Sequence, residues 1–544
     1  MEKISCTKVV LPGESEEKSS GKIGYKIVSR GIKCEKLRNL IIRAVKAHKS
    51  NSSNPASSTP GESRFWTIGI TLLLIVMWAC GMQSMAFHNA KWPATAKFQF
   101  AHPAVLIPER VYRNNGYLTV SSNGGLNQMR SGISDMVTIA RFLNLTLVVP
   151  ELDNTSFWQD NSQFGDIFDV DHFIDSLRDE LRIVKELPPT QKEKLKTQPL
   201  YQMATRSWGN MSYYYRTVSF IGFFNFNSPT FPYLRQEQVL PVFKKFGIVH
   251  FLKTDARLSN NEPLENVQKM RCRVNYEGLR FTPHIEKIGK KVVSILRKKG
   301  PFLALHLRFE KDMLAFTGCT EELDKEEVKE LTSMRYACPW WKEKEINSTH
   351  KREEGLCPLT PGEVGLALKA LDIDPEIQVY IAAGEIYGKD KRLDDLRAFY
   401  PNLVKKETLL PSADMGEIRY HSNRMAAVDY IVSLASDTFA PSYDGHMAKV
   451  VEGHRRYLGY KTTIRLDRKV LVALIDRYRS GKMKWDEFSD LVKKTHSGLM
   501  GGPIERLKIP GKPKEEDYFY LNPEECLPKI DPSLRGLRSD KTKH

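Results

Sequence analysis

Residues 117–151 read YLTVSSNGGLNQMRSGISDMVTIARFLNLTLVVPE, and their apolar spacing predicts the fold class. Residues 117–122 and 145–151 have the apolar pattern of strands, and residues 130–143 have that of an amphipathic helix. Two strands joined by a helix within about 35 residues are typical of a βαβ unit with parallel strands. The loop at residues 123–128 then follows the first strand at its carboxyl end, where open parallel sheets bind ligands.

A second alternating set follows the apolar-periodic stretch 285–299. Strands are expected over residues 301–308 and 376–388, helices over 361–371 and 391–400, and a further strand and helix within 429–456. This order predicts a second parallel α/β domain. We therefore expect two Rossmann-like domains facing across a cleft, at residues 111–290 and 291–527, followed by a basic tail at 528–544.

The N-terminal part is predicted to hold a membrane anchor. Residues 65–87 contain no charged side chain and would span about 34 Å as a helix, enough to cross a bilayer. Residues 1–64 hold 13 Lys and Arg against 6 Glu, which predicts a disordered cytosolic tail. We expect an uncleaved signal anchor, a stem at residues 88–110 and a catalytic part in the lumen of the secretory pathway.

The charge of the chain suggests an anionic partner. The formal net charge is +17, and 69 basic residues face 59 acidic ones beyond residue 64. No nucleic-acid-binding signature is present, so an acidic glycan fits better than nucleic acid. The alternative is a basic domain without an anionic partner.

The cysteines and glycosylation motifs agree with an oxidising lumen. Five cysteines lie beyond the predicted anchor without a CxxC pair, which allows two disulfides of unassigned pairing and one thiol. Four Asn-x-Ser/Thr motifs predict N-glycosylation. They are Asn144, Asn154, Asn210 and Asn347. The motif at Asn144 is the least favourable, because it lies between a predicted helix and a predicted strand.

The loop after the first strand is the first candidate site. Gly124 and Gly125 let the backbone approach a ligand closely, and the next helix offers free N–H groups to a phosphate. Asn127 adds a neutral donor. A tight turn without a ligand is the alternative.

The second candidate lies at the end of the strand at 301–308. His306 and Arg308 are two residues apart and share a face, while Leu307 between them points into the packing. A fixed guanidinium at this place suits the pyrophosphate of a nucleotide sugar. The alternative is a structural ion pair of Arg308 with Glu310 or Asp312.

The third candidate follows the apolar run at residues 430–434. Ser442 and the backbone of Gly445 precede a helix and are expected to bind phosphate or ribose, together with Asp444. A plain helix N-cap by Ser442 or Asp444 is the alternative. Two Asp-x-Asp pairs match a pattern of metal-dependent sugar transferases, but we expect no metal because Arg308 would neutralise the same charge. The pairs are Asp169 with Asp171 and Asp372 with Asp374.

The stretches at 115–153, 300–319, 334–348, 355–368, 379–388 and 447–464 resemble the plant O-fucosyltransferase-like proteins. Within glycosyltransferase family 106 they are most similar to the rhamnogalacturonan I rhamnosyltransferases. The resemblance implies a Golgi type II membrane enzyme with a GT-B fold, inverting and independent of metal or other cofactors. The donor would be UDP-β-L-rhamnose and the acceptor a galacturonate-ended pectin backbone.

The resemblance also assigns residues. His306 and Arg308 match the donor motif, with Arg308 on the pyrophosphate, and Leu307 between them is also expected to contact the donor. Gly124, Gly125 and Asn127 match the glycine loop, and Ser442, Asp444 and Gly445 match the nucleotide-binding segment. Asn123 stands where one branch of the protein O-fucosyltransferases has a Glu that can serve as the catalytic base, and Asn cannot accept a proton. The base is therefore open, with Glu310 and Asp444 as candidates.

One segment departs from the family pattern. Residues 216–236 hold five phenylalanines where relatives pass directly between the flanking stretches, so they are interpreted as an insertion or as a gene-model artefact. A real loop would reshape the acceptor side. An O-fucosyltransferase using GDP-fucose and an inactive Golgi scaffold stay as alternative functions.

Overall fold

The computed structural model describes residues 108–155, 159–204, 233–254, 265–339, 341–459 and 461–500. All of them belong to one compact unit. The predicted anchor, both tails, the stem up to residue 107 and most of the Phe-rich segment lie outside these residues. Within the described ranges, no helix combines the length and apolar character needed to cross a membrane.

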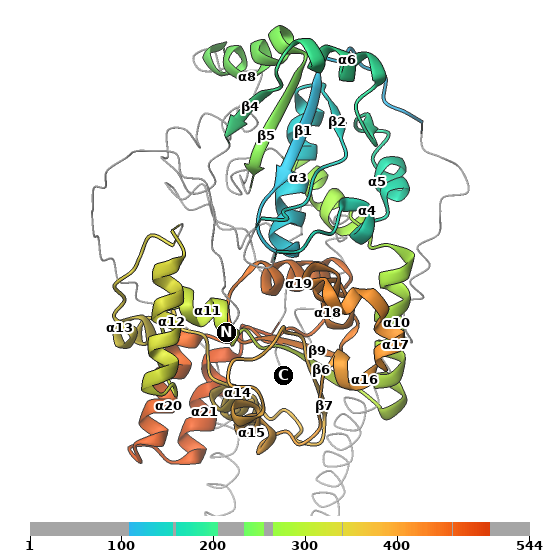
Figure 1. Cartoon of the computed structure of the whole chain (residues 1–544). Helices are drawn as coiled ribbons and strands as arrows, with labels where there is room; N and C mark the ends of the chain where they lie inside the picture. Colours follow the sequence, from blue (N-terminus) through green and yellow to red (C-terminus); the bar gives the residue numbers. More distant parts are fainter. Residues whose placement is uncertain are drawn as a thin grey trace, which may run out of the picture. The chain divides into compact units, whose positions relative to one another are not determined.

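The first sheet confirms the βαβ prediction. Strand β1 pairs in parallel with β2 on one side and with β5 on the other, so that Tyr117 lies opposite both Thr146 and Ile248. The order is β3-β2-β1-β5-β4, and Figure 1 shows β5, β1 and β2 side by side. The strands are β1 (Tyr117–Ser122), β2 (Thr146–Val148), β3 (Ile183–Val184), β4 (Tyr201–Ala204) and β5 (Ile248–Thr254).

Helix α3 (Leu126–Phe142) makes the crossover between β1 and β2. It starts four residues before the predicted helix, with Gly125 at the N-cap and no side chain capping it. Nearly all of α3 is buried, since it lies under the sheet and also contacts α18 and α19. The other helices of this half are α4 (Phe164–Ile167), α5 (Val170–Ser176), α6 (Pro189–Thr197), α8 (Tyr233–Phe246), α9 (Glu265–Arg273) and the π-helix η1 (Val274–Gly278).

The second sheet is also parallel, with the order β8-β7-β6-β9. Every residue of the inner strand β6 is buried, as its continuous apolar run predicts. The α/β prediction with two parallel sheets is therefore confirmed for the described residues, while the domain boundaries stay predictions. The strands are β6 (Phe302–His306), β7 (Gln378–Ile381), β8 (Leu403–Val404) and β9 (Thr438–Pro441).

Helices cover both faces of this sheet. Phe302 and Ala304 join one core with α10 and α18, while Leu303 and Leu305 join the other with α14, α20 and α21. Figure 1 shows α20 and α21 next to α14. The helices are α10 (Pro283–Lys299), α11 (Lys311–Thr317), α12 (Lys325–Ala337), α13 (Ser348–Glu353), α14 (Pro361–Ala370), α15 (Asp390–Arg397), α16 (Lys406–Leu409), α17 (Ser412–Met415), the 3-10 helix η2 (Gly416–Tyr420), α18 (Ser422–Ala435), α19 (His446–Tyr457), α20 (Arg468–Arg479) and α21 (Trp485–His496).

Three predicted strands were too long. The strand expected over 145–151 is found only at β2 (Thr146–Val148). The strand expected over 301–308 ends at His306, because the chain then turns so that the Arg308 side chain can reach two carboxylates. The strand expected over 376–388 ends at Ile381, and the chain turns through Gly388, whose φ of 78° favours glycine. Both strand ends in the second sheet become loops at the same edge.

Candidate active site

Strands β6 and β9 end next to each other and bring three predicted residues together. The Ser442 backbone N–H donates to the carbonyl oxygen of His306 at 2.9 Å. The Ser442 hydroxyl accepts a hydrogen bond from the backbone N–H of Arg308, also at 2.9 Å. Ser442 is fully buried, so its hydroxyl holds the turn after β6 against the end of β9.

His306 is a neutral imidazole. Its Nδ1 lies 2.8 Å from the carbonyl oxygen of Ala382, and because a carbonyl only accepts, Nδ1 carries the proton. Burial lowers the pKa of His306 below its usual value, which outweighs the opposing effect of Glu310. Nε2 is therefore left as an acceptor.

Arg308 is paired with both neighbouring carboxylates. Its Nη1 donates to Glu310 and, at 3.0 Å, to Asp312; its Nη2 donates to Asp312 at 2.6 Å. Burial disfavours the cation, but the two carboxylates outweigh it, so the pKa of Arg308 is raised. The structural ion pair that the sequence left open is thus present, and a pyrophosphate at Arg308 would compete with these two carboxylates for the guanidinium.

Glu310 and Leu307 have different surroundings. The second oxygen of Glu310 accepts a hydrogen bond from the backbone N–H of Gly384 at 3.2 Å. Leu307 is fully buried in the core on the α14 side of the sheet. A donor contact by Leu307 would therefore come from its backbone.

Asp444 forms an ion pair away from Arg308. Its side chain is 70% exposed and accepts a hydrogen bond from Arg468 at 2.8 Å. Burial opposes ionisation, but Arg468 and further cations outweigh it and lower the pKa of Asp444. Asp444 is therefore a weak proton acceptor. The N-cap alternative is wrong, because α19 begins after Gly445 without a side-chain cap.

The glycine loop lies between β1 and α3. Gly124 has a φ of 88°, and a side chain there would overlap the Gln128 side chain, so the position requires glycine. The Gly124 N–H donates to Asp153 at 2.8 Å. Asn127 is buried, and its Oδ1 has no hydrogen-bond partner among the described residues.

The glycine loop and the end of β6 are not directly linked. No hydrogen bond or ion pair in the described part of the chain connects Gly124, Gly125 or Asn127 with His306 or Arg308. Asp153, which orders this loop, was missed by the sequence reasoning. It lies two residues after the predicted strand at 145–151, and that position was the signal that the sequence offered.

A buried charge pair supports the loop after β7 and was also missed. Lys406 donates to the carbonyl oxygen of Ala383 at 2.8 Å and to Asp429 at 2.9 Å. Tyr380 donates to the other oxygen of Asp429 at 2.7 Å. Burial raises the pKa of Asp429 to about 6 despite its neighbour Lys406. No local sequence pattern joins residues so far apart.

The family follows from comparison with known proteins. The family model "GDP-fucose protein O-fucosyltransferase" matches residues 117–458, which include both sheets and the strand-end site. The chain belongs to this O-fucosyltransferase family. The resemblance stated from the sequence is thereby confirmed, and the chain is a glycosyltransferase.

Curated relatives of this O-fucosyltransferase-family chain come from Arabidopsis thaliana. Rhamnogalacturonan I rhamnosyltransferase 1 is 53% identical over 89% of this chain and 94% of its own length. Rhamnogalacturonan I rhamnosyltransferase 4 is 54% identical over 77% and 83%. O-fucosyltransferase 38 is 44% identical over 80% of both chains.

Solved structures are more distant. A crystal structure of POFUT1 in complex with GDP aligns with 65% of this chain and 99% of that chain, at 16% identity and a TM-score of 0.39. The fucosyltransferase NodZ soaked with GDP-fucose aligns with a TM-score of 0.34 at 10% identity.

The described cysteines include one complete disulfide. Cys319 and Cys357 are joined, and Cys338 is a buried thiol. Among the glycosylation motifs, Asn154 and Asn347 are exposed, while Asn210 lies outside the described residues. Asn144 is partly buried and accepts a hydrogen bond from Arg110 at 2.8 Å, which makes it a poor glycosylation site.

The two Asp-x-Asp pairs have structural contacts instead of a shared site. Asp169 caps helix α5 by accepting from the His172 N–H, and Asp372 pairs with Lys493. Asp374 accepts from the Glu376 N–H. Within the described ranges, no three carboxylate, histidine or cysteine side chains gather as metal ligands.

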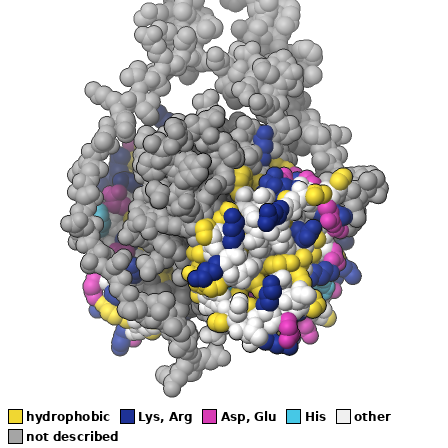
Figure 2. All heavy atoms as spheres, turned by 90° about the horizontal axis from the view of Figure 1, so that it is seen from above, with side chains coloured by type: hydrophobic (Ala, Val, Ile, Leu, Met, Phe, Trp, Pro, Cys, Tyr) yellow, Lys and Arg dark blue, Asp and Glu magenta, His cyan; other side chains and the backbone are white. Residues whose placement is uncertain are grey.

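The basic character of the chain is not concentrated on the face shown in Figure 2. On this face, Lys and Arg side chains are separated by polar and apolar surface.

Proposed function

We propose that this chain is a pectin rhamnosyltransferase. It transfers rhamnose from UDP-β-L-rhamnose to the galacturonate end of the rhamnogalacturonan I backbone, on a GT-B framework of two Rossmann-like domains. The observation that carries the proposal is the hydrogen bond between the Ser442 hydroxyl and the backbone of Arg308, which joins the ends of β9 and β6. The chain is also more than half identical to enzymes named rhamnogalacturonan I rhamnosyltransferases.

The reaction is a single displacement with inversion. The acceptor hydroxyl forms the new bond to C1 of rhamnose while the bond from C1 to the diphosphate oxygen breaks. Negative charge develops on the leaving diphosphate, and the Arg308 guanidinium stabilises it. Gly125 and Gly445 add backbone donors, while Ser442, whose N–H is bonded to His306, holds the end of β9 in place. This charge compensation needs neither a metal nor another cofactor.

The proton of the acceptor hydroxyl goes to Glu310 in this proposal. Glu310 lies beside Arg308, whereas the lowered pKa of Asp444 makes that carboxylate a weaker base. When the donor diphosphate binds Arg308, one Glu310 oxygen loses its ion pair. Donor binding thus frees the base for the acceptor.

We also propose a Golgi location as a type II membrane protein, anchored by residues 65–87. The support is the uncharged 23-residue run and the excess of Lys and Arg before it. The disulfide between Cys319 and Cys357 agrees with an oxidising lumen.

Fucosyl transfer from GDP-fucose is the second candidate. It is favoured by the description of the matched family model and by the relative named O-fucosyltransferase 38. Both donors carry the same diphosphate, so the contacts of Arg308 do not distinguish them.

Transfer by the full chain tests the proposal. The chain is incubated with UDP-rhamnose, and separately with GDP-fucose, together with a labelled oligosaccharide that ends in galacturonate. A rhamnose-sized mass gain that survives a chelator supports the proposal. A fucose-sized gain would replace it with the second candidate, and no gain from the folded chain would refute both.

A further inference from the structure

A cavity of about 300 Å³ lies beside the end of β9. Its lining includes Pro441 and Asp444, which flank the buried Ser442 of the candidate active site. Residues 354–356, helix α19 and residues 465–469 complete most of the wall. The volume is at the lower end for ligand pockets, of a size for a small polar ligand.

Most charges in this wall neutralise each other. Arg468 pairs with Asp444 at 2.8 Å, and Lys469 pairs with Glu354 at 2.8 Å. Asp467 caps helix α20 by accepting from its third N–H group. These pairs leave the cavity with carboxylate oxygens that can still accept further hydrogen bonds, since each oxygen has two lone pairs.

Arg465 is the exception in the wall. Its backbone N–H donates to the carbonyl oxygen of Leu499, which fixes its position, but its guanidinium has no hydrogen-bond or ion-pair partner among the described residues. It is partly buried and acts on Asp444 through its charge. One arginine is thus available to an incoming anion.

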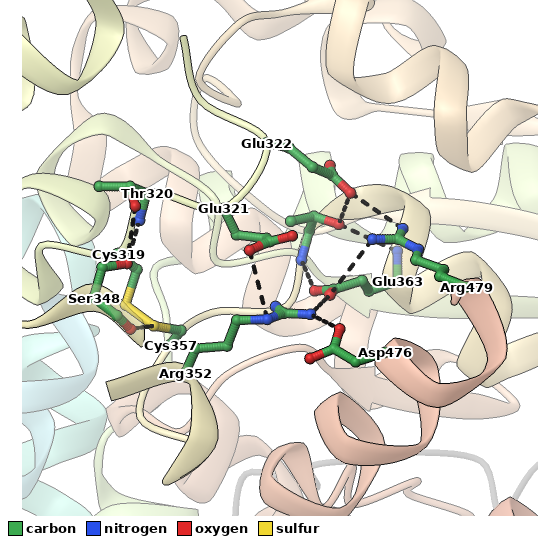
Figure 3. A network of polar contacts seen from close by, with 11 residues as sticks. Cys319, Thr320, Glu321, Glu322, Ser348, Arg352, Cys357, Glu363, Asp476 and Arg479 are labelled. Carbon is green, nitrogen blue, oxygen red and sulfur yellow. Dashed lines mark hydrogen bonds and ion pairs between the residues drawn. A yellow bond between two sulfur atoms is a disulfide. The ribbon is translucent and has the colours of Figure 1, made fainter. Parts of the chain in front are cut away.

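The wall is held by a buried ion network and a disulfide (Figure 3). Arg352, at the end of α13, pairs with the fully buried Glu363 of α14 and, at 2.8 Å, with Asp476 of α20. The bond between Cys319 and Cys357 fixes the chain directly after residues 354–356. The wall segment at residues 354–356 and helix α20 are therefore anchored before a ligand arrives, as in preorganised sites.

We propose that this cavity binds a hexuronate residue of the acceptor glycan, with Arg465 holding its carboxylate. A hexuronate carries one negative charge and several hydroxyl groups. One unpaired guanidinium matches the charge, and the wall carboxylates accept from the hydroxyls. A diphosphate fits less well, because its two charges would face the carboxylates of Asp444 and Glu354. The inference rests on the proposed function with its acidic acceptor, and it assigns the galacturonate of that acceptor to this cavity.

The test compares the full-length wild-type chain with the full-length Arg465→Gln variant. Arg477→Gln is the matched control, because Arg477 is exposed on α20 and its only described ion pair is a long contact with Glu487 at 3.7 Å. We measure KM for acceptor oligosaccharides with a free or a methyl-esterified terminal galacturonate, KM for the donor, and direct binding of galacturonate disaccharide by calorimetry.

Arg465→Gln is expected to raise KM for the free-acid acceptor roughly tenfold, as for loss of a charge-assisted hydrogen bond. KM for the methyl ester and for the donor should stay unchanged, as should all values in the control. An equal rise in KM for the free-acid and the methyl-ester acceptor would overturn the inference. A rise in KM for the donor alone would also overturn it and would indicate a nucleotide pocket.

Calorimetry separates failure of this inference from failure of the proposed function. If the wild-type chain transfers no rhamnose but binds the disaccharide, and Arg465→Gln weakens that binding tenfold, the site stands and the reaction is wrong. Equal binding by both chains, or no binding by the wild-type chain, refutes the site whatever the activity.

Discussion

Replacing Arg308 distinguishes a catalytic arginine from a structural one. In the free protein the guanidinium is held by Glu310 and Asp312, whose side chains are only 15% and 12% exposed. If it stabilises the leaving diphosphate, Arg308→Gln should lower kcat by about 10²–10³-fold, or roughly 3–4 kcal/mol of transition-state stabilisation. Single-turnover transfer at saturating donor measures this effect.

The same substitution also leaves two carboxylates without their cation. Removing one partner of a buried ion pair costs about 3–5 kcal/mol, and the partial exposure here lowers that figure. Urea unfolding of Arg308→Gln, alone and combined with Asp312→Asn, separates the two effects. The double variant should regain stability, because only one carboxylate is then left unpaired.

Catalysis should not return with stability. The double variant of Arg308→Gln and Asp312→Asn is expected to stay at least 10²-fold slower than the wild-type chain. Arg308→Lys should give an intermediate rate, because Lys keeps the charge but not the bidentate geometry. A stable double variant with wild-type kcat would refute the catalytic role and leave Arg308 as a structural ion pair.

Three further predictions concern the framework. Lys406→Met removes the cation beside Asp429, whose pKa burial raises to about 6, and should destabilise the chain by roughly 3–5 kcal/mol near pH 8. The destabilisation should be smaller near pH 5, where Asp429 is largely protonated. Because the folded-state pKa of Asp429 lies above its unfolded value, its contribution to the free energy of unfolding falls as pH rises. Urea unfolding at both pH values measures this difference. Gly124→Ala forces a left-handed residue to carry a side chain and should cost about 1–3 kcal/mol and raise the donor KM; unchanged values of both would contradict the assigned loop geometry. Replacing Cys319 and Cys357 by Ser opens a loop of separation 38 and should cost roughly 4 kcal/mol, measured by thermal unfolding against the oxidised wild-type chain.

The sequence by itself determined the elements whose periodicity is local. The strand at residues 117–122 was predicted with its bounds as found, and the helix at residues 361–371 within one residue. The burial of β6 and the need for glycine in the turn at Gly124 could also be predicted from the sequence, because each depends on nearby residues. The same local patterns singled out His306, Arg308 and Ser442, and the family resemblance assigned them to the donor; the structure places them at two neighbouring strand ends.

Only the tertiary structure decided which charges meet. Arg308 had two open interpretations, and its pairing with Glu310 and Asp312 depends on how the chain turns after β6. The pair of Lys406 with Asp429 and the cavity at Arg465 join segments far apart in the chain. Such contacts are set by how sheets and helices pack, and periodicity along one segment contains no information about the partner that another segment brings.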